Sequence, residues 1–510
     1  MLAKVHSSAL YGIEAIPVTI EVHIDKGVGY HLVGLPDNAI RESNYRIAAA
    51  LLNNGYRIPG KKITINMAPA DLRKEGAAYD LPLALGILVA SGQLVTELLE
   101  EYLIMGELSL DGQLKPVKGA LSIALNARAC GFRGIVVPEE NVGESVVVEG
   151  LEVRGAARLC EVLSFFRGDG DLPLGNHTAS CLQAGPGHES PDFSDVRGQE
   201  AVKRCMEIAA AGGHNLILIG PPGSGKTMLA KRLPGILPPM SLEESLETTR
   251  IHSVASGPGR GGLIRRRPFR SPHHTISDTA LVGGGSYPQP GEISLAHNGV
   301  LFLDELPEFK RNVLEVMRQP LEDREVTIAR TKFTITYPSS FMLVASMNPS
   351  PSGYFSPESH GFSNSRNEMQ RYLSRISGPL LDRIDIHMEV NPVPFDQISS
   401  SRKGESSAQI RKRVVAARKI QSKRFEGQAK VHCNAQMDTR QIRTCCALQK
   451  STLKLLRTAM ERLELSARAY DRILKLARTI TDLEGCSDIE ESHLAEAIQY
   501  RSLDREGWLG

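Results

Sequence analysis

The sequence has no long apolar run and no closely spaced cysteine pair. Its longest apolar run, Leu81–Ala90, has ten residues and is interrupted by Pro82, whereas a transmembrane helix needs about 20. No apolar stretch follows Lys4, so a signal peptide is not expected. The eight cysteines are scattered and none forms CxxC. In a chain of this length they indicate reduced thiols and a cytoplasmic location rather than a disulfide framework.

Neither positive nor negative charge predominates in the sequence. The chain has 60 Lys+Arg and 58 Asp+Glu, and its net charge of +2 indicates no particular class of partner. Apolar residues make up 41% of the chain and charged residues 23%. These are globular values, and they exclude a disordered chain, a collagen and a polytopic membrane protein. At roughly 150 residues per domain, about three to four domains are expected.

The first part of the chain, residues 1–166, has the pattern of a mixed α/β domain. Val18–Ile24 and Lys62–Met67 alternate like strands, and Ala39–Asn53 between them has the pattern of a helix. Residues 167–191 are rich in Gly, Pro, Ser and His and have no apolar periodicity, which predicts an interdomain linker.

The remainder divides into two parts. Residues 192–394 alternate helical runs with short buried strands, which predicts a parallel sheet flanked by helices. Residues 395–510 have a helical pattern almost throughout, with good helix formers and few glycines. The predicted fold class is therefore α/β, with a helical domain in the C-terminal part of the chain.

A phosphate-binding loop is predicted between a buried strand, Leu216–Ile219, and a helical run, Met228–Leu233. The intervening sequence fits GxxxxGK[ST], in which glycines let backbone N–H groups curl around phosphate oxygens. Lys226 is expected to reach the β- and γ-phosphates of ATP, and Thr227 to bind Mg²⁺. The predicted ATP-binding residues are Gly220, Pro221, Pro222, Gly223, Ser224, Gly225, Lys226 and Thr227.

A second strand, Val300–Leu303, ends in two acidic residues. Ligands in open α/β sheets bind at the carboxyl ends of the strands, where these acids are expected to lie. Asp304 is expected to hold Mg²⁺ through water, and Glu305 to polarise the attacking water. An apolar run followed by Asp-Glu is by itself an ordinary strand end, and its position after a phosphate-binding loop gives it this interpretation.

Three further residues are candidates for the chemistry. Asn348 follows a third strand, Phe341–Ser346, and can orient the attacking water; the alternative is an Asn that caps the turn before Pro349. Arg383 can stabilise the charge of phosphoryl transfer across a subunit boundary, and Arg468 can do so from the helical domain. Both could instead be ordinary surface arginines in salt bridges.

These motifs, in this order, resemble the AAA+ ATPases, and more closely the magnesium-chelatase-like branch and its YifB/ComM family. The stretches that carry the resemblance are Arg267–Gly285, Pro290–Phe309 and Arg371–Asp385. The resemblance extends over essentially the whole chain. It implies a P-loop core with a C-terminal helical lid, and a homo-oligomer. This would be a hexameric ring that binds ATP and Mg²⁺ between subunits, with Arg383 acting on the neighbour's nucleotide.

The resemblance also implies two insertions in the ATPase core that face the central pore of the ring. One is an insertion in the second helix, within residues 255–295. The other is a hairpin before Asn348, with strands at Val326–Ala329 and Phe333–Thr336.

The N-terminal block resembles the fold of Lon-type proteases through Lys74–Ala78 and Gly106–Gly112. Those proteases use a serine nucleophile with a lysine base. Here the two positions are Ala78 and Leu121, which supply neither a nucleophile nor an amine. The resemblance therefore implies a proteolytically inactive domain that is retained for assembly or for binding a protein partner.

His273 and His274 suggest a metal-binding interpretation. Adjacent side chains point apart on a strand or a helix, so a single metal site rarely uses both. Packing within a loop, or a hydrogen bond, is the favoured interpretation.

Basic residues are unevenly distributed although the net charge is small. Residues 260–270 contain five arginines and no acid, and residues 401–430 hold ten Lys+Arg and two Glu. Such stripes are typical of proteins that bind the phosphate backbone of nucleic acids without reading the base sequence. A solvated helix face, or contacts between ring subunits, would give the same pattern.

Two kinds of function are compatible with the sequence. As a DNA translocase, the ring would use ATP hydrolysis for branch migration in recombination or natural transformation, as the resemblance to ComM-type proteins implies. As a magnesium-chelatase-like or chaperone-like ATPase, it would remodel a protein partner. Salt-dependent DNA binding distinguishes the first from the second.

Overall fold

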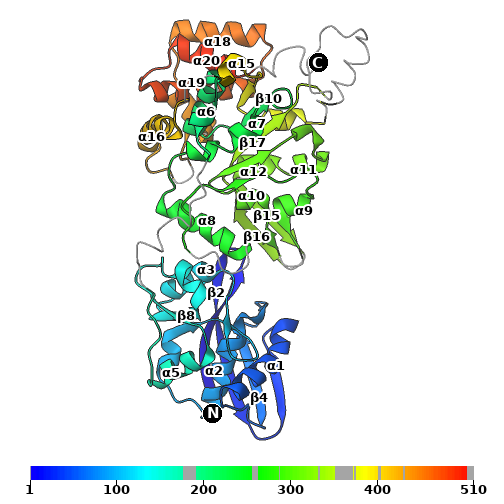
Figure 1. The fold of residues 1–510 in the computed structure, drawn as a ribbon, viewed down its shortest axis with the longest axis vertical. Helices are drawn as coiled ribbons and strands as arrows, with labels where there is room; N and C mark the ends of the chain where they lie inside the picture. Colours follow the sequence, from blue (N-terminus) through cyan, green and yellow to red (C-terminus); the bar gives the residue numbers. More distant parts are fainter. Residues whose placement is uncertain are drawn as a thin grey trace.

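The computed structural model describes residues 2–175, 191–255, 262–285, 288–330, 333–350, 372, 375–399, 404–428 and 431–501. Within these residues, three regions follow one another along the long axis of an elongated molecule (Figure 1). They are an N-terminal α/β domain, a middle α/β domain and a cluster of helices from the C-terminal part of the chain. Of the expected linker, residues 176–190 lie outside the described residues.

The N-terminal domain is built on a seven-stranded sheet. Its strands are β1 (Leu2–Tyr11), β2 (Glu14–Asp25), β3 (Gly29–Val33), β4 (Lys62–Ala68), β5 (Tyr102–Ile104), β8 (Gly134–Pro138) and β9 (Glu152–Ala156), with a small pair of β6 (Glu107–Leu108) and β7 (Leu114–Lys115) beside it. The order is β3-β4-β2-β1-β5-β8-β9. The strands predicted from alternation lie inside β2 and β4, and these two strands pair antiparallel.

Five helices belong to this domain: α1 (Asn38–Asn53), α2 (Asp80–Ala90), α3 (Ala120–Ala129), α4 (Val142–Ser145) and α5 (Leu159–Arg167). The longest apolar run of the sequence is α2, in which every residue except Val89 is buried. Pro82 lies in its first turn, where no intrahelical hydrogen bond is lost. The run is therefore a core helix, and among the described residues no helix is long and apolar enough to cross a membrane.

The middle domain has a five-stranded parallel sheet, as the alternation of helical runs and buried strands predicts. Its strands are β10 (Leu216–Ile219), β11 (Phe269–Arg270), β14 (Val300–Leu303), β17 (Met342–Met347) and β18 (Ile386–Glu389). They lie in the order β11-β14-β17-β10-β18. Each neighbouring pair is parallel, so all the strands end at one edge of the sheet, here called the carboxyl edge, and begin at the other, the amino edge.

Alternate side chains of this sheet enter two different apolar cores. Leu216 and Leu218 of β10 point into a core that continues into the C-terminal helices, whereas Ile217 and Ile219 point into a second core on the other face. Because both faces are covered, the strands are continuous apolar runs in the sequence.

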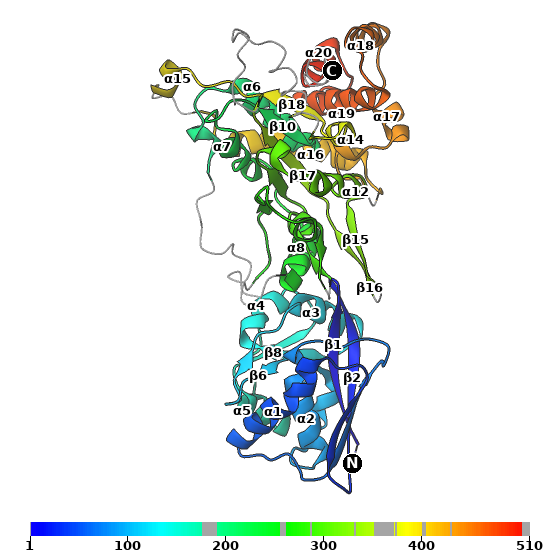
Figure 2. The ribbon, with the colours of Figure 1, turned by 90° about the vertical axis from the view of Figure 1, so that its right-hand side faces the viewer.

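The helices of the middle domain are mostly short. They are α6 (Glu200–Gly212), α7 (Lys226–Ala230), α8 (Leu242–Ala255), α9 (Asp278–Val282), α10 (Glu292–Leu295), α11 (Arg311–Glu315), α12 (Arg318–Asp323) and α14 (Gly378–Leu381), with a two-residue strand pair of β12 (Gly283–Gly284) and β13 (Gln289–Pro290). The expected hairpin is present as β15 (Glu325–Arg330) and β16 (Phe333–Pro338), which pair antiparallel. It extends from the sheet toward the N-terminal domain (Figure 2).

Helices are the main elements of the described C-terminal region, as predicted. Its helices are α15 (Phe395–Ser399), α16 (Ser407–Arg424), α17 (Thr439–Cys445), α18 (Lys450–Arg462), α19 (Ala467–Glu484) and α20 (Glu491–Gln499). Ile473 and Leu476 of α19 share the apolar core of β10. The lid is thus joined to one face of the parallel sheet by continuous hydrophobic packing.

The turn between β1 and β2 joins the N-terminal domain to the middle domain (Figure 2). Tyr11 Oη donates to the carbonyl of Thr334 on β16 at 3.1 Å. Gly12 has a φ of +64°, and a Cβ there would lie 2.6 Å from Ile335 Cγ2. The carbonyl of Ile13 accepts from Arg250 Nη2 on α8 at 3.1 Å. The turn therefore contacts both α8 and the hairpin of the middle domain.

Candidate functional site

The predicted phosphate-binding loop connects the end of β10 to the start of α7. Gly223 and Gly225 have φ values of +77° and +90°, a left-handed conformation that favours glycine. A Cβ on Gly220 would lie 2.3 Å from the carbonyl oxygen of Val390, so this position also needs glycine. Lys226 Nζ donates to the carbonyls of Gly220 and Pro221 at 2.7 and 2.9 Å. The loop thus curls around its own lysine at the N-terminus of a helix.

Other residues fix or flank this loop. Gln199, just before α6, donates from Nε2 to the carbonyl of Ser224 at 3.0 Å. Ser224 is buried, and its Oγ has no hydrogen-bond partner within the described residues. Pro222 is exposed at the tip of the loop. The sequence motif did not indicate the contribution of Gln199, which lies well before the motif.

Three oxygen-bearing side chains meet beside the loop. Thr227 Oγ1 donates to Asp304 Oδ2 at 2.8 Å, and Ser346 Oγ donates to Asp304 Oδ1. Asp304 follows β14 and Ser346 lies near the end of β17, so both are at the carboxyl edge, where the pattern predicted Asp304 but did not indicate Ser346. Hydroxyl and carboxylate oxygens are the ligands that Mg²⁺ prefers. Thr227 and Asp304 are therefore arranged in a way that fits a magnesium ion.

Asn348 follows β17 and lies in the same cluster. Its Oδ1 accepts from Lys226 Nζ at 3.2 Å, so the end of the third strand contacts the loop. Burial lowers the pKa of Lys226, an effect that the nearby Asp304 and Glu305 oppose. Burial also raises the pKa of Tyr372 to about 12, although its hydrogen bond with the Asn348 backbone opposes the shift. Tyr372 is a neighbour that the sequence patterns did not indicate.

Glu305 projects from the strand end into a more open position than Asp304. Its backbone φ is +55° and its side chain is 55% exposed. Its N–H donates to Ser346 Oγ at 3.2 Å, and His274 Nδ1 lies 3.8 Å from Glu305 Oε2. The carboxylate is thus available to a water molecule on the solvent side of the cluster.

His273 and His274 pack against each other within a loop, as the favoured interpretation expected. Their ring centroids are 4.1 Å apart, because the two residues lie in a loop after β11, where strand and helix alternation does not apply. His273 Nδ1 is 2.9 Å from Thr275 Oγ1, a hydrogen bond of the kind that was favoured. His274 instead lies beside Glu305.

The two candidate arginines lie elsewhere. In the parallel pairing of β10 with β18, Leu216 is opposite Ile386, so Arg383 precedes the amino end of β18. Arg383 forms an ion pair with Glu322, and Arg468 Nη1 is 3.1 Å from Asp382 Oδ2. The structure therefore brings the two arginines to the amino edge and away from Lys226, which follows the carboxyl end of β10.

Most arginines of the two basic stretches whose side chains are described take part in contacts within the fold. Arg267 pairs with Glu244 at 3.0 Å and Arg270 with Glu292 at 2.6 Å, whereas Arg260 lies outside the described residues. On α16, Arg413 pairs with Glu207, and Arg424 with Asp482. The exposed cations of this helix that stand in no ion pair among the described residues are Arg411, Lys412, Lys419 and Lys423. The positive stripe facing solvent is therefore smaller than the sequence indicated.

In the N-terminal domain, Ala78 and Leu121 pack against the same apolar cluster. Both side chains are hydrocarbon and supply neither a nucleophile nor an amine. Lys118 is exposed, and Ser122 Oγ donates to the carbonyl of Ile13 at 2.6 Å.

Three family models match the chain, and together they span most of it. "Magnesium chelatase, subunit ChlI" matches residues 192–398. "Subunit ChlI of Mg-chelatase" matches residues 20–141. "Magnesium chelatase, subunit ChlI C-terminal" matches residues 404–501.

Some relatives match this chain over nearly its full length, and others match only part of it. The "Uncharacterized protein YifB" of Salmonella typhimurium is 48% identical over 511 residues, which cover 99% of this chain and 98% of that protein. The "Competence protein ComM" of Haemophilus influenzae is 44% identical over 507 residues, with the same coverage. The "Magnesium-chelatase 38 kDa subunit" of Rhodobacter capsulatus is 23% identical over 175 residues, or 31% of this chain and 50% of that protein.

Proposed function

Because this chain belongs to the YifB/ComM family of magnesium-chelatase-like proteins, we propose that it hydrolyses ATP with Mg²⁺ at the carboxyl edge of its parallel sheet. The observation that carries the proposal is the 2.8 Å contact between Thr227 Oγ1 and Asp304 Oδ2, beside a lysine that also contacts Asn348. Glycines at strained positions, a helix N-terminus and oxygen ligands together suit a triphosphate and its metal ion.

Bound ATP and Mg²⁺ supply the phosphoryl group and a charge that neutralises its oxygens. Lys226 exchanges its carbonyl partners for phosphate oxygens, and the loop N–H groups point at the same oxygens. Glu305, exposed beside the cluster, accepts a proton from the attacking water, and Asn348 orients that water. Thr227 would hold the metal ion, and Asp304 would hold it through water.

Arg383 and Arg468 serve the nucleotide of a neighbouring copy. They lie at the amino edge, a strand length away from the loop of their own chain. A head-to-tail contact brings the amino edge of one copy against the carboxyl edge of the next, and such contacts close into rings. A hexameric ring with nucleotide between subunits satisfies this geometry. In such a ring, Arg383 and Arg468 of one subunit face the nucleotide that is bound by the next.

The work done by the ring is translocation along DNA, for branch migration in recombination or natural transformation. Two observations support this part. One full-length relative is named as a competence protein. In addition, Lys419 and Lys423 form an exposed pair one turn apart on α16, with no carboxylate partner among the described residues.

The experiment is the ATPase rate with single-stranded, duplex and forked DNA at two salt concentrations. Stimulation that falls steeply with salt is expected, because released counterions set that slope. Replacing Lys419 and Lys423 with Gln should reduce the slope by about 1 to 2. The matched control replaces Lys450 and Lys454, an exposed pair with the same spacing on α18. A rate that no DNA changes would contradict translocation and leave the ATPase proposal intact.

Protein remodelling is the second candidate, and one observation favours it. The N-terminal domain has only hydrocarbon at the Ala78 and Leu121 positions, yet its β1–β2 turn is joined to the hairpin of the ATPase core. A protein partner held by this domain would be connected directly to the moving part of the ring.

A further inference from the structure

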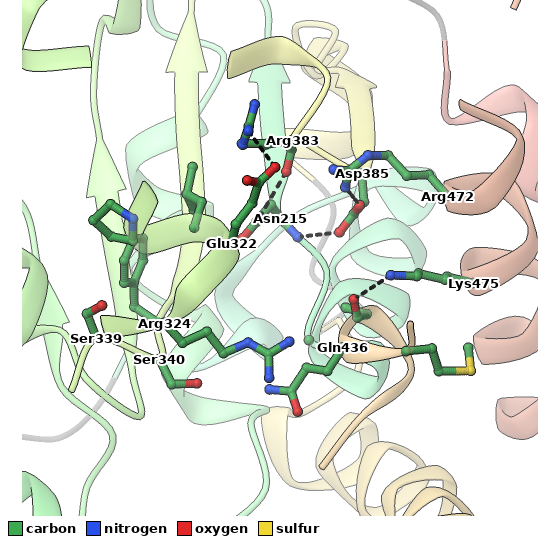
Figure 3. Close-up of a pocket in the computed structure, with 16 residues that line it drawn as sticks. Asn215, Glu322, Arg324, Ser339, Ser340, Arg383, Asp385, Gln436, Arg472 and Lys475 are labelled. Carbon is green, nitrogen blue, oxygen red and sulfur yellow. Dashed lines mark hydrogen bonds and ion pairs between the residues drawn. The ribbon is translucent and has the colours of Figure 1, made fainter. Parts of the chain in front are cut away.

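The chain segment that starts at the carboxyl edge continues to the amino edge. Its start follows Phe309, whose ring centroid is 6.4 Å from that of His274. Near its end, Glu322 forms an ion pair with Arg383, beside a cavity of about 260 Å³ between the middle domain and α19 (Figure 3). Residues 310–325, which contain α11, α12 and the first residue of β15, therefore connect the two edges. We call them the connecting segment.

One face of the connecting segment is buried and the other is exposed. Val313, Leu314 and Met317 point into the second core of the parallel sheet. Val316 is a large apolar side chain, yet it is 38% exposed. The exposed side chains recur three or four residues apart, as on one face of a helix. They are Asn312, Val316, Gln319 and Asp323. This face is therefore available to another molecule.

Charges of opposite sign lie at the two ends of the connecting segment. At its start, Lys310 and Arg311 are exposed and form no ion pair with any described residue. At its end, Asp323 and Glu325 are likewise exposed and unpaired within the described chain. Glu322, the third acid at this end, is paired but still 58% exposed. The carboxyl edge thus presents cations to solvent, and the amino edge presents acids.

These charges do not stabilise the helices that carry them. Lys310 is the N-cap of α11 and Arg311 is its first residue, where the unbonded N–H groups disfavour a cation. Asp323 is the last residue of α12, where the unbonded carbonyls disfavour an acid. Their placement therefore points to a contact outside this chain.

A groove beside the acids has room for incoming side chains. Its volume is about 910 Å³, and Asp323 and Glu325 line it together with Glu243 at the start of α8 and Ser422 of α16. Pockets that enclose small molecules have roughly 300–1,000 Å³. The groove can therefore receive two long cationic side chains.

We propose that the exposed face of the connecting segment is a docking surface for a second copy of this chain. Lys310 and Arg311 of one copy enter the groove beside Asp323 and Glu325 of the next. Complementary charge fixes the register of such a contact and opposes wrong pairings. Because the cations lie at the carboxyl edge and the acids at the amino edge, the contact is head-to-tail, as a ring requires.

The docking surface rests on the proposed function, in which the two edges meet between neighbouring copies. Docking also changes the amino edge itself. Arg311 of the incoming copy competes with Arg383 for Glu322, whose exposed carboxylate also lines the groove. The ion pair that holds Arg383 is therefore loosened only when a neighbour has docked.

The first experiment measures the mass of the full-length chain by analytical ultracentrifugation with ATPγS and Mg²⁺. Lys310→Glu with Arg311→Glu places acids against acids, and Asp323→Lys with Glu325→Lys places cations against cations. Either double variant should need about tenfold more protein to assemble, because like charges in a contact oppose association. Lys450→Glu with Lys454→Glu, at an exposed pair on α18, is the matched control and should assemble like the wild type.

The second experiment mixes the two double variants in equal amounts. Each chain then presents to the other the charge that its own copies lack, so complexes in which the two chains alternate should form at the wild-type concentration. A single chain with all four substitutions should also assemble, because its cations and acids have exchanged ends. A variant that had failed to fold would not be rescued in this way.

Recovery of assembly in the mixture supports the docking surface. The proposal is overturned if the Lys310→Glu, Arg311→Glu chain assembles like the wild type, or if neither the mixture nor the fourfold variant recovers. A complex of only two chains would also overturn it, since a two-fold pairing of antiparallel segments satisfies both ends at once. ATP hydrolysis by the wild type is measured separately. If the wild type hydrolyses no ATP, the proposed function fails, whereas the mass measurement still tests the docking surface.

Discussion

The two edges of the parallel sheet differ in how their polar residues are satisfied. At the carboxyl edge the candidate residues contact one another, with Lys226 on Asn348 and Thr227 on Asp304. At the amino edge, Arg383 and Arg468 instead contact acids that are 58% and 36% exposed. The candidate residues of the first edge therefore contact one another, whereas the arginines of the second edge contact only acids near them; on the proposed function, their ligand is the nucleotide of a neighbouring copy.

On the proposed function, this difference means that one chain carries two incomplete halves of a reaction site. The strands of a parallel sheet all run the same way, so loops at opposite edges are separated by the length of the strands. A residue before β18 cannot reach a phosphate held after β10 in the same chain. On the proposed function, the ring contact supplies the missing half to each nucleotide.

The largest effect is expected from Arg383→Ala, which removes the central cation of the amino edge. Hydrolysis should fall by about 10³-fold or more, as for other arginines that act across a subunit boundary, and ATP binding should persist. Arg375→Ala is the control, because Arg375 forms an ordinary surface pair with Glu308 and is 53% exposed. Equal rates of hydrolysis in the two variants would contradict the catalytic role proposed for the amino edge. Steady-state turnover and nucleotide binding are the measurements.

Glu305→Gln tests the carboxyl edge and is expected to have the next largest effect. Loss of the proton acceptor should lower turnover by about 10² to 10³-fold, while binding of ATP is retained because Lys226 and Asp304 are untouched. Single-turnover hydrolysis with equilibrium nucleotide binding separates the two steps. Turnover like that of the wild type would contradict the role of Glu305.

Arg468→Ala compares the contributions of the two arginines at the amino edge. Arg468 is 63% exposed, so solvent screens its charge more than that of Arg383, which is 13% exposed. We expect turnover to fall about tenfold, and the loss should be greater at low salt than at high salt. A salt-independent loss would point to a structural effect on α19.

The smallest effect on turnover is expected at the contact between the N-terminal domain and the hairpin. Gly12→Ala places a Cβ 2.6 Å from Ile335, and overpacking of this kind typically costs about 1–3 kcal/mol. Amide exchange in residues 333–338 should accelerate. Gly131→Ala is the matched control, since Gly131 also has a positive φ, +79°, but has nothing within 4 Å of an added Cβ. Equal exchange in both variants would show that the contact is absent in solution.

Much of the carboxyl edge could be predicted from the sequence because it is encoded locally. The loop residues are contiguous, and Asp304 and Asn348 each directly follow an apolar strand. The parallel direction of β10, β14 and β17 then brings these residues to one edge. Ser346 could have been found by the same reasoning, as a polar residue near the end of a buried strand.

The rest depends on contacts between distant segments. Arg424 pairs with Asp482 and Arg413 with Glu207, so a basic stripe in the sequence is partly neutralised in the fold. His274 lies near Glu305 because of the conformation of the loop after β11, which the sequence pattern does not predict. The cavity between the middle domain and α19 exists only because α19 packs over the amino edge. The predicted boundaries after residues 166, 191 and 394 stay predictions.

The proposed division of the site between two subunits is tested most directly by mixing two inactive chains. A Lys226→Ala chain has an intact amino edge, and an Arg383→Ala chain has an intact carboxyl edge. In an equal mixture that exchanges subunits, about a quarter of the contacts in a ring pair both intact edges. We predict recovery of about a quarter of the wild-type turnover from two chains that are each nearly inactive. No recovery, with mixed rings demonstrated by subunit exchange, would contradict the division of the site.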